Sequence, residues 1–232
     1  MSDLLVSILI LTFARTKNLE ESIYSALNQN YKNYEVLVLN GCKEQKLFIN
    51  NPKVKIINID GNDLTISKKR NMLIDNAKGE ILTPLDDDDL LFPWHLEQHV
   101  NNIIKNNVDV SLSFECTFWE RKINKLTSCL PYTANLAHKN NKNIRYIDDK
   151  HADFDQHFRN HIQNNINYKT LKIDIPSYIY CWNNDVFHMC GLGNEQNLIN
   201  NMQYRLDNGI EPTGNIEIVP RAQEDVKKLL KV

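Results

Sequence analysis

The first hundred residues alternate short apolar runs with segments of helical length, and this alternation is the strongest constraint on the fold. The apolar runs cover residues 6–11 (VSILIL), 35–40 (EVLVLN), 54–59 (VKIINI) and 80–85 (EILTPL). Unbroken apolar runs of this length are typical of strands that are buried on both faces. Because the connections are long enough for helical crossovers, the pattern predicts an α/β fold with a mainly parallel central sheet and helices on both faces.

Two of the connecting segments carry clear helix signals. The first runs from Ser67, a plausible N-cap, to Gly79 as the stop signal. The second starts near Pro93 and places apolar residues at helical spacing, at Leu96, Val100, Ile103 and Ile104. His95 and His99 lie four residues apart on this helix. We expect them on a solvated face rather than in a zinc site, because no third ligand accompanies them.

The second half of the chain is less regular. Residues 109–119 predict one strand or a bent pair, and residues 120–150 a polar loop. Further elements are expected as a strand over 171–182, helices over 153–165, 194–208 and 222–231, and a short strand over 215–220. No internal repeat and no Pro-rich or Ser-rich linker interrupts the chain, so we predict a single domain over residues 1–232.

The composition argues against some classes of function. The 232 residues are 42% hydrophobic and 24% charged, as in ordinary globular proteins, and the net charge of −2 gives no reason to expect a nucleic-acid partner. The longest apolar run, residues 4–14, is much shorter than a membrane span, so no transmembrane segment is predicted. Five widely spaced cysteines without a CxxC pair predict reduced thiols in the cytoplasm.

Four carboxylates, Asp86–Asp89, directly follow the fourth apolar run. Like charges this close disfavour their shared ionisation, so the cluster is either a solvated acidic turn or a binding site for a cation. Carboxylates suit Mg²⁺ or Mn²⁺, which complete their shells with water and phosphate oxygens. Ligands of parallel sheets bind beyond the carboxyl ends of the strands, so Thr12, Asn40 and Asp86–Asp89 are expected to converge on one crevice.

The order of these motifs resembles a known family. VSILILTFARTKNLEESIYSALNQNYKNYEVLVLNGC is similar to the opening of family 2 glycosyltransferases, and KKRNMLIDNAKGEILTPLDDDD resembles the ARN and LDxDD motifs that follow. The resemblance covers about residues 5–100 in order and spacing. It implies a single GT-A (nucleotide-diphospho-sugar transferase) fold, which is related to the Rossmann fold. Residues 1–108 would bind the nucleotide-sugar and residues 109–232 the acceptor.

The resemblance also implies a set of residues that bind the donor: Thr12, Phe13, Arg15, Asn40, Arg70, Asp86, Asp87 and Asp88. Asp88 and Asp86, within the DxD motif, would hold Mn²⁺ or Mg²⁺ against the diphosphate. The chain departs from the family pattern at Leu11, at Ala14 and at residues 39–42, where LNGC replaces VDDG. The last departure alters the expected contact to the base and leaves the choice of uridine open.

HADFDQHFRN (151–160) resembles the family segment that carries the catalytic base. Asp153 would take the place of this general base. Alternatively, Asp153 and Asp155 only charge a helix N-terminus, where the helix dipole stabilises carboxylates. Asp155, Trp119 and Trp182 are weaker candidates for contact with the acceptor.

The resemblance therefore implies a metal-dependent, inverting glycosyltransferase (hexosyltransferase-like). It would move a sugar, UDP-linked in the leading hypothesis, to a hydroxyl of a glycan, a lipid-linked or a small-molecule acceptor. Two alternatives stay open: a catalytically idle nucleotide- or sugar-binding module of the same fold, and a nucleotidyltransferase. The nucleotidyltransferase is less favoured, because residues 12–18 contain no glycine. The predicted location is cytoplasmic, and peripheral association with a membrane is left open.

Overall fold

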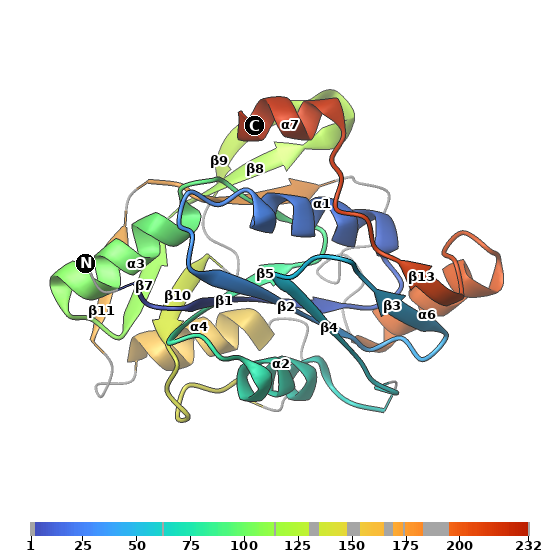
Figure 1. Cartoon of the computed structure of the whole chain (residues 1–232), viewed down its shortest axis with the longest axis horizontal. Coiled ribbons are helices and arrows are strands. Elements are labelled where there is room, and N and C mark those ends of the chain that lie inside the picture. The colour runs from blue at the N-terminus through green and yellow to red at the C-terminus, as the bar shows by residue number, and fades with distance from the viewer. Residues whose placement is uncertain are drawn as a thin grey trace.

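A seven-stranded sheet forms the centre of the computed structural model, which describes residues 3–61, 63–113, 115–129, 135–147, 154–164, 169–173, 175–182 and 195–231 (Figure 1). The strand order is β11-β7-β10-β5-β1-β2-β4. Neighbouring strands run parallel except β10, which is antiparallel to both β5 and β7. The strands are β1 (Val6–Thr12), β2 (Tyr34–Asn40), β4 (Val54–Asn58), β5 (Ile81–Asp86), β7 (Val110–Ser113), β10 (Leu136–Lys139) and β11 (Thr170–Ile173).

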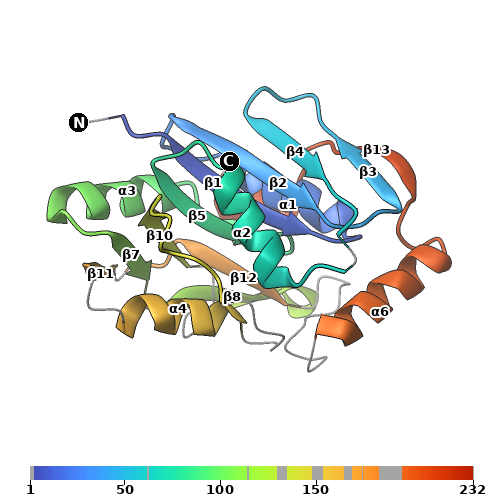
Figure 2. The ribbon, with the colours of Figure 1, turned by 90° about the horizontal axis from the view of Figure 1, so that it is seen from below.

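Helices cover both faces of this sheet (Figures 1 and 2). α1 (Thr16–Leu27) and α3 (His95–Asn106) lie on one face, and α2 (Ile66–Asn76) and α4 (Phe154–Asn164) on the other. Successive side chains of β1 point to opposite faces, so Ile8 and Ile10 pack with α1 and α3, whereas Leu9 packs with α2 and α4. Both faces are thus apolar, which confirms the predicted mainly parallel α/β sheet.

A second sheet and a strand pair extend the domain. The second sheet has the order β6-β12-β8-β9, with β6 (Leu90–Leu91), β12 (Tyr178–Trp182), β8 (Cys116–Glu120) and β9 (Lys125–Cys129); the short helix η1 (Arg121–Ile123) joins β8 to β9. Towards the C-terminus, α6 (Glu195–Asp207) is followed by β13 (Gly214–Glu217), which pairs in parallel with β3 (Gln45–Phe48). The last helix, α7 (Glu224–Leu230), packs Val226 and Leu230 against the second sheet.

Several boundaries differ from the sequence prediction. The predicted bent pair over 109–119 is confirmed as β7 and β8. The predicted loop over 120–150 is wrong, because it contains β9 and also β10, a buried strand inside the central sheet. The predicted single strand over 171–182 is also wrong: β11 and β12 flank Pro176 and belong to different sheets.

The α2 helix also begins and ends elsewhere than predicted. Thr65, not Ser67, is the N-cap, and its hydroxyl accepts a hydrogen bond from the backbone N–H of Lys68. The helix ends at Asn76, before Gly79. Gly79 instead lies against β1, where an added Cβ would come within 2.5 Å of the Ser7 nitrogen. Gly79 therefore allows close backbone packing and does not terminate the helix.

The α3 histidines are buried, so the prediction of a solvated face is wrong. His95 and His99 have no exposed surface, and their rings lie 4.5 Å apart. His95 contacts the Thr83 and Ser177 hydroxyls, and His99 Nδ1 lies 2.8 Å from Ser111 Oγ. Hydroxyl partners explain the misjudged pattern: Thr83, Ser111 and Ser177 contact rings that sequence spacing alone places in water.

Histidine burial predicts a fold that loses stability in acid. Burial lowers the pKa of His99 to about 3, whereas an unfolded chain has a histidine pKa of about 6.5. The unfolded state therefore binds one more proton below pH 6.5, and this neutral histidine costs about 2 kcal/mol of stability between pH 7 and pH 5. In urea unfolding, a His99→Gln variant should lack this loss. An identical pH dependence in the two proteins would contradict the assignment.

Candidate nucleotide-sugar site

The carboxyl ends of β1, β2 and β5 lie side by side at one edge of the central sheet. In the strand register, Thr12 is the partner of Asn40, and Leu11 is the partner of Asp86. The chain runs outward from β1 through β2 to β4 and then returns to place β5 on the other side of β1. Such a reversal opens a crevice at the strand ends. The predicted convergence of Thr12, Asn40 and the acidic cluster is confirmed.

Each of the four consecutive carboxylates has a partner, and Asp87 and Asp88 share one. Arg70 forms an ion pair with Asp86, and Arg15 spans Asp87 and Asp88, with N–O distances of 2.8 and 2.7 Å. Asp89 accepts hydrogen bonds of 2.8 Å from the Tyr178 hydroxyl and from the Cys181 N–H. Asp87 and Asp89 are each only 1% exposed, so the alternative of a solvated acidic turn is wrong.

The turn between β1 and α1 directs Arg15 towards this cluster. Ala14 is buried and has a φ of 51°, a left-handed conformation that residues with a Cβ rarely adopt. Arg15 follows as the N-cap of α1, but its side chain makes no capping hydrogen bond. The cap comes from Glu211, whose carboxylate accepts from both the N–H and the hydroxyl of Thr16 and also pairs with Arg205. The Arg15 side chain is therefore not needed for capping, and it pairs with the acidic turn instead.

The cluster has more carboxylates than guanidinium partners. Burial raises the pKa of Asp87 to about 7; the Arg15 charge opposes this rise, and the neighbouring Asp88 adds to it. Burial, reinforced by Asp88 and Asp86, also raises the pKa of Asp89 well above its usual range. Neither Asp87 oxygen accepts a hydrogen bond of ordinary geometry within the described part of the chain. Two guanidinium groups face four carboxylates, and a divalent cation, which favours the ionised form of a carboxylate, fits this imbalance.

The protein would hold such an ion with few of its own ligands. Among the residues that the structure describes, no three His, Cys, Asp or Glu side chains are grouped so as to hold a metal by themselves. Mg²⁺ in particular is usually held by one or two carboxylates together with water and substrate phosphates. Asp88, 9% exposed in its side chain, and Asp86, 22% exposed, can reach a ligand in the crevice.

Asn40 is used by the protein itself. Its Nδ2 group donates to the Gln45 carbonyl at 2.8 Å and to Asn58 Oδ1 at 3.0 Å, and its Oδ1 accepts from the Cys42 N–H. The side chain is fully buried. Asn40 thus ties the end of β2 to β3 and β4, and a base can reach it only if these strand ends separate.

Lys69 is a site residue that the sequence prediction missed. It is 4% exposed, and its ammonium lies 5.7 Å from the centre of the Phe13 ring. A Cβ added to Gly41 would approach the Lys69 side chain at 3.3 Å, so the absence of a side chain at Gly41 makes room for the lysine. A signal was available: the chain has KRN where the family pattern has ARN.

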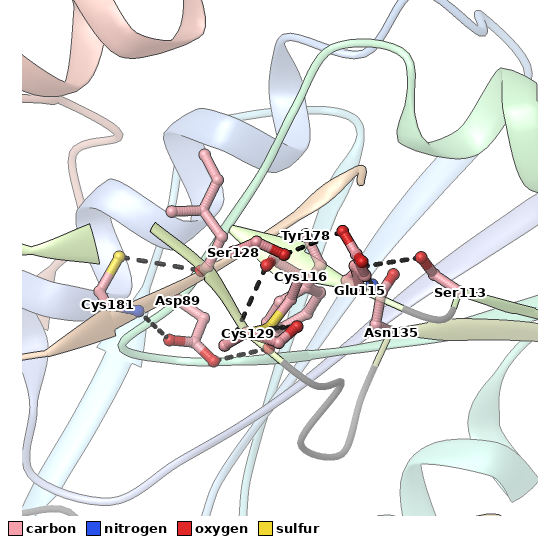
Figure 3. Close-up of a disulfide and its surroundings, with 10 residues drawn as sticks. Asp89, Ser113, Glu115, Cys116, Ser128, Cys129, Asn135, Tyr178 and Cys181 are labelled. Carbon is pink, nitrogen blue, oxygen red and sulfur yellow. Dashed lines mark hydrogen bonds between the residues drawn. A yellow bond between two sulfur atoms is a disulfide. The ribbon is translucent and has the colours of Figure 1, made fainter. Parts of the chain in front are cut away.

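Tyr178 connects the acidic turn to the second sheet (Figure 3). Its hydroxyl donates to Asp89 and accepts from the Asp86 N–H at 3.2 Å. In the same core cluster lies Cys116, which forms a disulfide with Cys129 across the β8–β9 pair. The prediction of reduced thiols is therefore wrong for this pair. Cys42 and Cys181 are free and buried, and Cys190 lies outside the described residues.

The residues predicted for the acceptor side have different positions. Trp119 is 1% exposed and packs in the core beneath α7, which does not fit contact with an acceptor. Trp182 is partly exposed and lies 6.3 Å, between ring centres, from both Phe118 and Tyr180. Asp153 lies outside the described residues. Asp155 lies in the first turn of α4.

The tie between Asp89 and β12 should be a large contribution to stability. Asp89→Ala removes the acceptor of two buried donors, so we expect the free energy of unfolding to fall by about 2–4 kcal/mol. As the control, Asp75→Ala breaks an ion pair with Arg145 in which Asp75 is 62% exposed, and should cost less than about 1 kcal/mol. Urea unfolding measures both values. Equal losses would show that Asp89 does not anchor the second sheet.

Comparison with known proteins gives both sequence and structural relatives. An *Escherichia coli* protein described as UDP-Glc:alpha-D-GlcNAc-diphosphoundecaprenol beta-1,3-glucosyltransferase WfgD is 27% identical over 117 residues, which are 47% of this chain and 44% of that protein. The structure of *S. aureus* TarS 1-349 in complex with UDP-GlcNAc matches 80% of this chain and 60% of its own, with a TM-score of 0.63 and 16% identity. The chain thus spans about half the length of these relatives.

A third relative shares the fold over nearly the whole chain. The mannosyltransferase PcManGT from *Pyrobaculum calidifontis*, in complex with GDP-Man and Mn²⁺, matches 97% of this chain and 68% of its own, with a TM-score of 0.58 and 13% identity. At these identities the structures show the fold alone, which is that of GT-A glycosyltransferases, as predicted. No described helix combines the length and the apolar character that crossing a membrane requires.

The sequence also matches a family model. The model described as Glycosyl transferase family 2 aligns with residues 7–171. This range contains the β1–α1 turn, the acidic turn and α4, and it extends over more than half of the chain. The resemblance seen in the sequence is therefore confirmed, and this chain belongs to glycosyl transferase family 2.

Proposed function

We propose that this chain transfers a sugar from a nucleoside-diphosphate donor, UDP-linked, to a hydroxyl group of an acceptor, with inversion at the anomeric carbon. The observation that carries the proposal is the buried acidic turn beside Arg15 and Arg70 at the ends of β1 and β5. The printed descriptions of two relatives, a UDP-Glc-dependent enzyme and a complex with UDP-GlcNAc, support a UDP-linked donor.

Asp88 and Asp86 would hold a divalent cation, Mn²⁺ or Mg²⁺. Such an ion, when bound, neutralises the charge that develops on the departing diphosphate. The surplus of carboxylates over guanidinium groups in the acidic turn supports this assignment, as does the Mn²⁺ in the description of the PcManGT complex. Arg70, whose side chain is 6% exposed, would hold Asp86 by their ion pair and orient it towards the donor.

The nucleoside would lie at the ends of β1 and β2. Thr12 and Phe13 form this edge, and the partly exposed Phe13 ring offers a face on which a base can stack. The Lys69 ammonium beside this ring provides hydrogen-bond donors for carbonyl oxygens of a base. Because Asn40 is engaged within the protein, we assign the base contact to Phe13 and Lys69 rather than to Asn40.

Asp153 would act as the general base. Its carboxylate takes the proton of the acceptor hydroxyl while the acceptor oxygen bonds to the anomeric carbon. The bond between that carbon and the diphosphate oxygen breaks on the opposite side, and the nucleoside diphosphate leaves with the electron pair. Asp153 directly precedes α4, which is held firmly: Arg159 donates to the Ser113 carbonyl at 2.7 Å, and Phe158 stacks on Tyr146.

An acceptor saccharide would stack on a row of aromatic rings on β8 and β12. Tyr180 pairs with Phe118 in the strand register, and Trp182 lies two residues further along the same face. All three rings are partly exposed, with centres 5.8–6.3 Å apart. The row starts at Tyr178, whose hydroxyl contacts the acidic turn, so an acceptor on these rings would extend towards the donor.

A panel of nucleotide-sugars, scored for release of nucleoside diphosphate, tests the reaction. We expect release to depend on Mn²⁺ or Mg²⁺ and kcat/KM to fall about a hundredfold or more in Asp88→Ala, because the leaving charge loses its stabilisation. Asp75→Ala, a carboxylate outside the site, is the matched control. A rate of nucleoside diphosphate release that changes neither without metal nor in Asp88→Ala would exclude the proposed chemistry.

The same assay separates the enzyme from a catalytically idle binding module, an alternative that the engagement of Asn40 favours. Asp153→Asn should abolish transfer while UDP binding, followed by calorimetry, stays unchanged. An idle module would bind UDP with or without this substitution and would show no transfer in either protein.

The aromatic row gives a separate prediction about the acceptor. Trp182→Ala should raise the acceptor KM about tenfold and leave the donor KM unchanged, since loss of one stacked ring weakens a bound sugar by about 1–2 kcal/mol. Phe48→Ala, which removes a ring that is 49% exposed on β3, serves as the control. An unchanged acceptor KM in Trp182→Ala would place the acceptor elsewhere.

The cytoplasmic location predicted from the sequence stays part of the proposal. The disulfide between Cys116 and Cys129 argues against this location, because such bonds are rare in the reducing cytosol. The acceptor class, a glycan, a lipid-linked sugar or a small molecule, also stays a proposal; the WfgD description names a diphosphoundecaprenol-linked sugar.

A further inference from the structure

Arg15 occupies the position in which a cation would be expected. Its two terminal nitrogens lie 2.8 Å from Asp87 Oδ1 and 2.7 Å from Asp88 Oδ2. The guanidinium side chain is 14% exposed, against 1% and 9% for the two carboxylates. A single side chain therefore neutralises two adjacent carboxylates that would otherwise repel each other.

Arg15 is held by these carboxylates and by little else. Its Nε atom is buried and has no hydrogen-bond partner among the described residues. The backbone, in contrast, is fixed: the Arg15 carbonyl accepts the first helical hydrogen bond, from Leu19, and Glu211 holds the next residue, Thr16. If the carboxylates release the guanidinium, the side chain can move while the backbone stays in place.

A divalent ion and this guanidinium cannot share Asp88 Oδ2 as it stands. This oxygen already accepts a hydrogen bond of 2.7 Å from Arg15 Nη1. An Mg²⁺ ion at 2.0–2.1 Å from the same oxygen would lie within a few ångströms of the guanidinium, and the two positive charges would repel each other. Binding of the ion at this oxygen thus requires Arg15 to release Asp88.

We propose that Arg15 is an internal counter-ion that holds Asp87 and Asp88 until the metal and the donor bind, and that it is then displaced onto the diphosphate of the donor. This inference rests on the proposed metal-dependent function. It makes the metal and the nucleotide cooperative ligands, because the metal alone must displace Arg15, whereas the metal with a diphosphate offers the released guanidinium a new anionic partner.

The test compares Mn²⁺ binding to the wild type and to Arg15→Gln, without and with UDP, by titration calorimetry and by the electron paramagnetic resonance signal of free Mn²⁺. Without UDP, we expect Arg15→Gln to bind Mn²⁺ about tenfold more tightly, as expected when one charged hydrogen bond no longer has to be broken. UDP should strengthen Mn²⁺ binding in the wild type. In Arg15→Gln, the factor by which UDP increases the Mn²⁺ affinity should be at least tenfold smaller.

Two further variants act as controls. Arg145→Gln also removes an arginine that pairs with an aspartate, at 2.9 Å, but outside the crevice, and should bind Mn²⁺ as the wild type does. Arg15→Lys keeps the charge but lacks the fork that spans two carboxylates, so its affinity for Mn²⁺ alone should lie between those of the wild type and Arg15→Gln. Arg15→Lys carries the test if Arg15→Gln does not fold.

The possible results separate the two levels of the proposal. Equal or weaker Mn²⁺ binding by Arg15→Gln and Arg15→Lys, with UDP coupling unchanged, would overturn the displacement of Arg15 and leave the metal site intact. No Mn²⁺ binding by any of these proteins, even with UDP, would overturn the metal site of the proposed function and this inference with it.

Discussion

The burial of four consecutive carboxylates at the end of β5 is the constraint on which the rest of the site depends. Charges this close and this buried are stable only when positive or hydrogen-bonding groups surround them. Three elements supply these groups: Arg15 follows β1, Arg70 lies on α2, and Tyr178 lies on β12. The acidic turn therefore holds together segments that are far apart in the sequence, and its geometry depends on all of them.

The C-terminal part of the chain stabilises the turn between β1 and α1. Glu211 caps α1 from 195 residues away, and Met202 and Leu206 of α6 pack against Ala14 and Cys42. The pairing of β13 with β3 fixes the same segment to the end of the sheet. These contacts keep the strained turn at Ala14 in place and leave the Arg15 side chain directed at the carboxylates. The position of Arg15, a proposed donor-site residue, thus depends on a helix and a strand that lie outside the range matched by the family model.

Elements that depend on neighbouring residues were predicted from the sequence, whereas features that depend on contacts between distant segments were not. Four strands of the first half, β1, β2, β4 and β5, were predicted nearly to the residue, because apolar runs buried on both faces and helical crossovers leave a local pattern. The short strands β3 and β6 were missed. β10 was missed because its four residues, LAHK, carry no such pattern and are buried only by their neighbours β5 and β7. The buried α3 histidines and the pairing of Cys116 with Cys129 were misjudged for the same reason: hydroxyls from β5 and β7 surround the rings, and a strand register aligns the two thiols.

The sequence by itself determined the α/β fold of the first half, the family and the presence of an acidic turn at a strand end. Each of these depends on a pattern of residues that are close together in the sequence. Only the tertiary structure decided the different surroundings of the four aspartates: Asp86 is paired with Arg70, Asp88 is partly exposed beside Arg15, Asp87 is buried against Arg15, and Asp89 is hydrogen-bonded to β12. It also decided that Asn40 serves the strands and that Lys69 lies beside Phe13. The physical reason is that desolvation and ion pairing depend on which groups lie within a few ångströms in space, and a run of four identical letters carries no information on that distance.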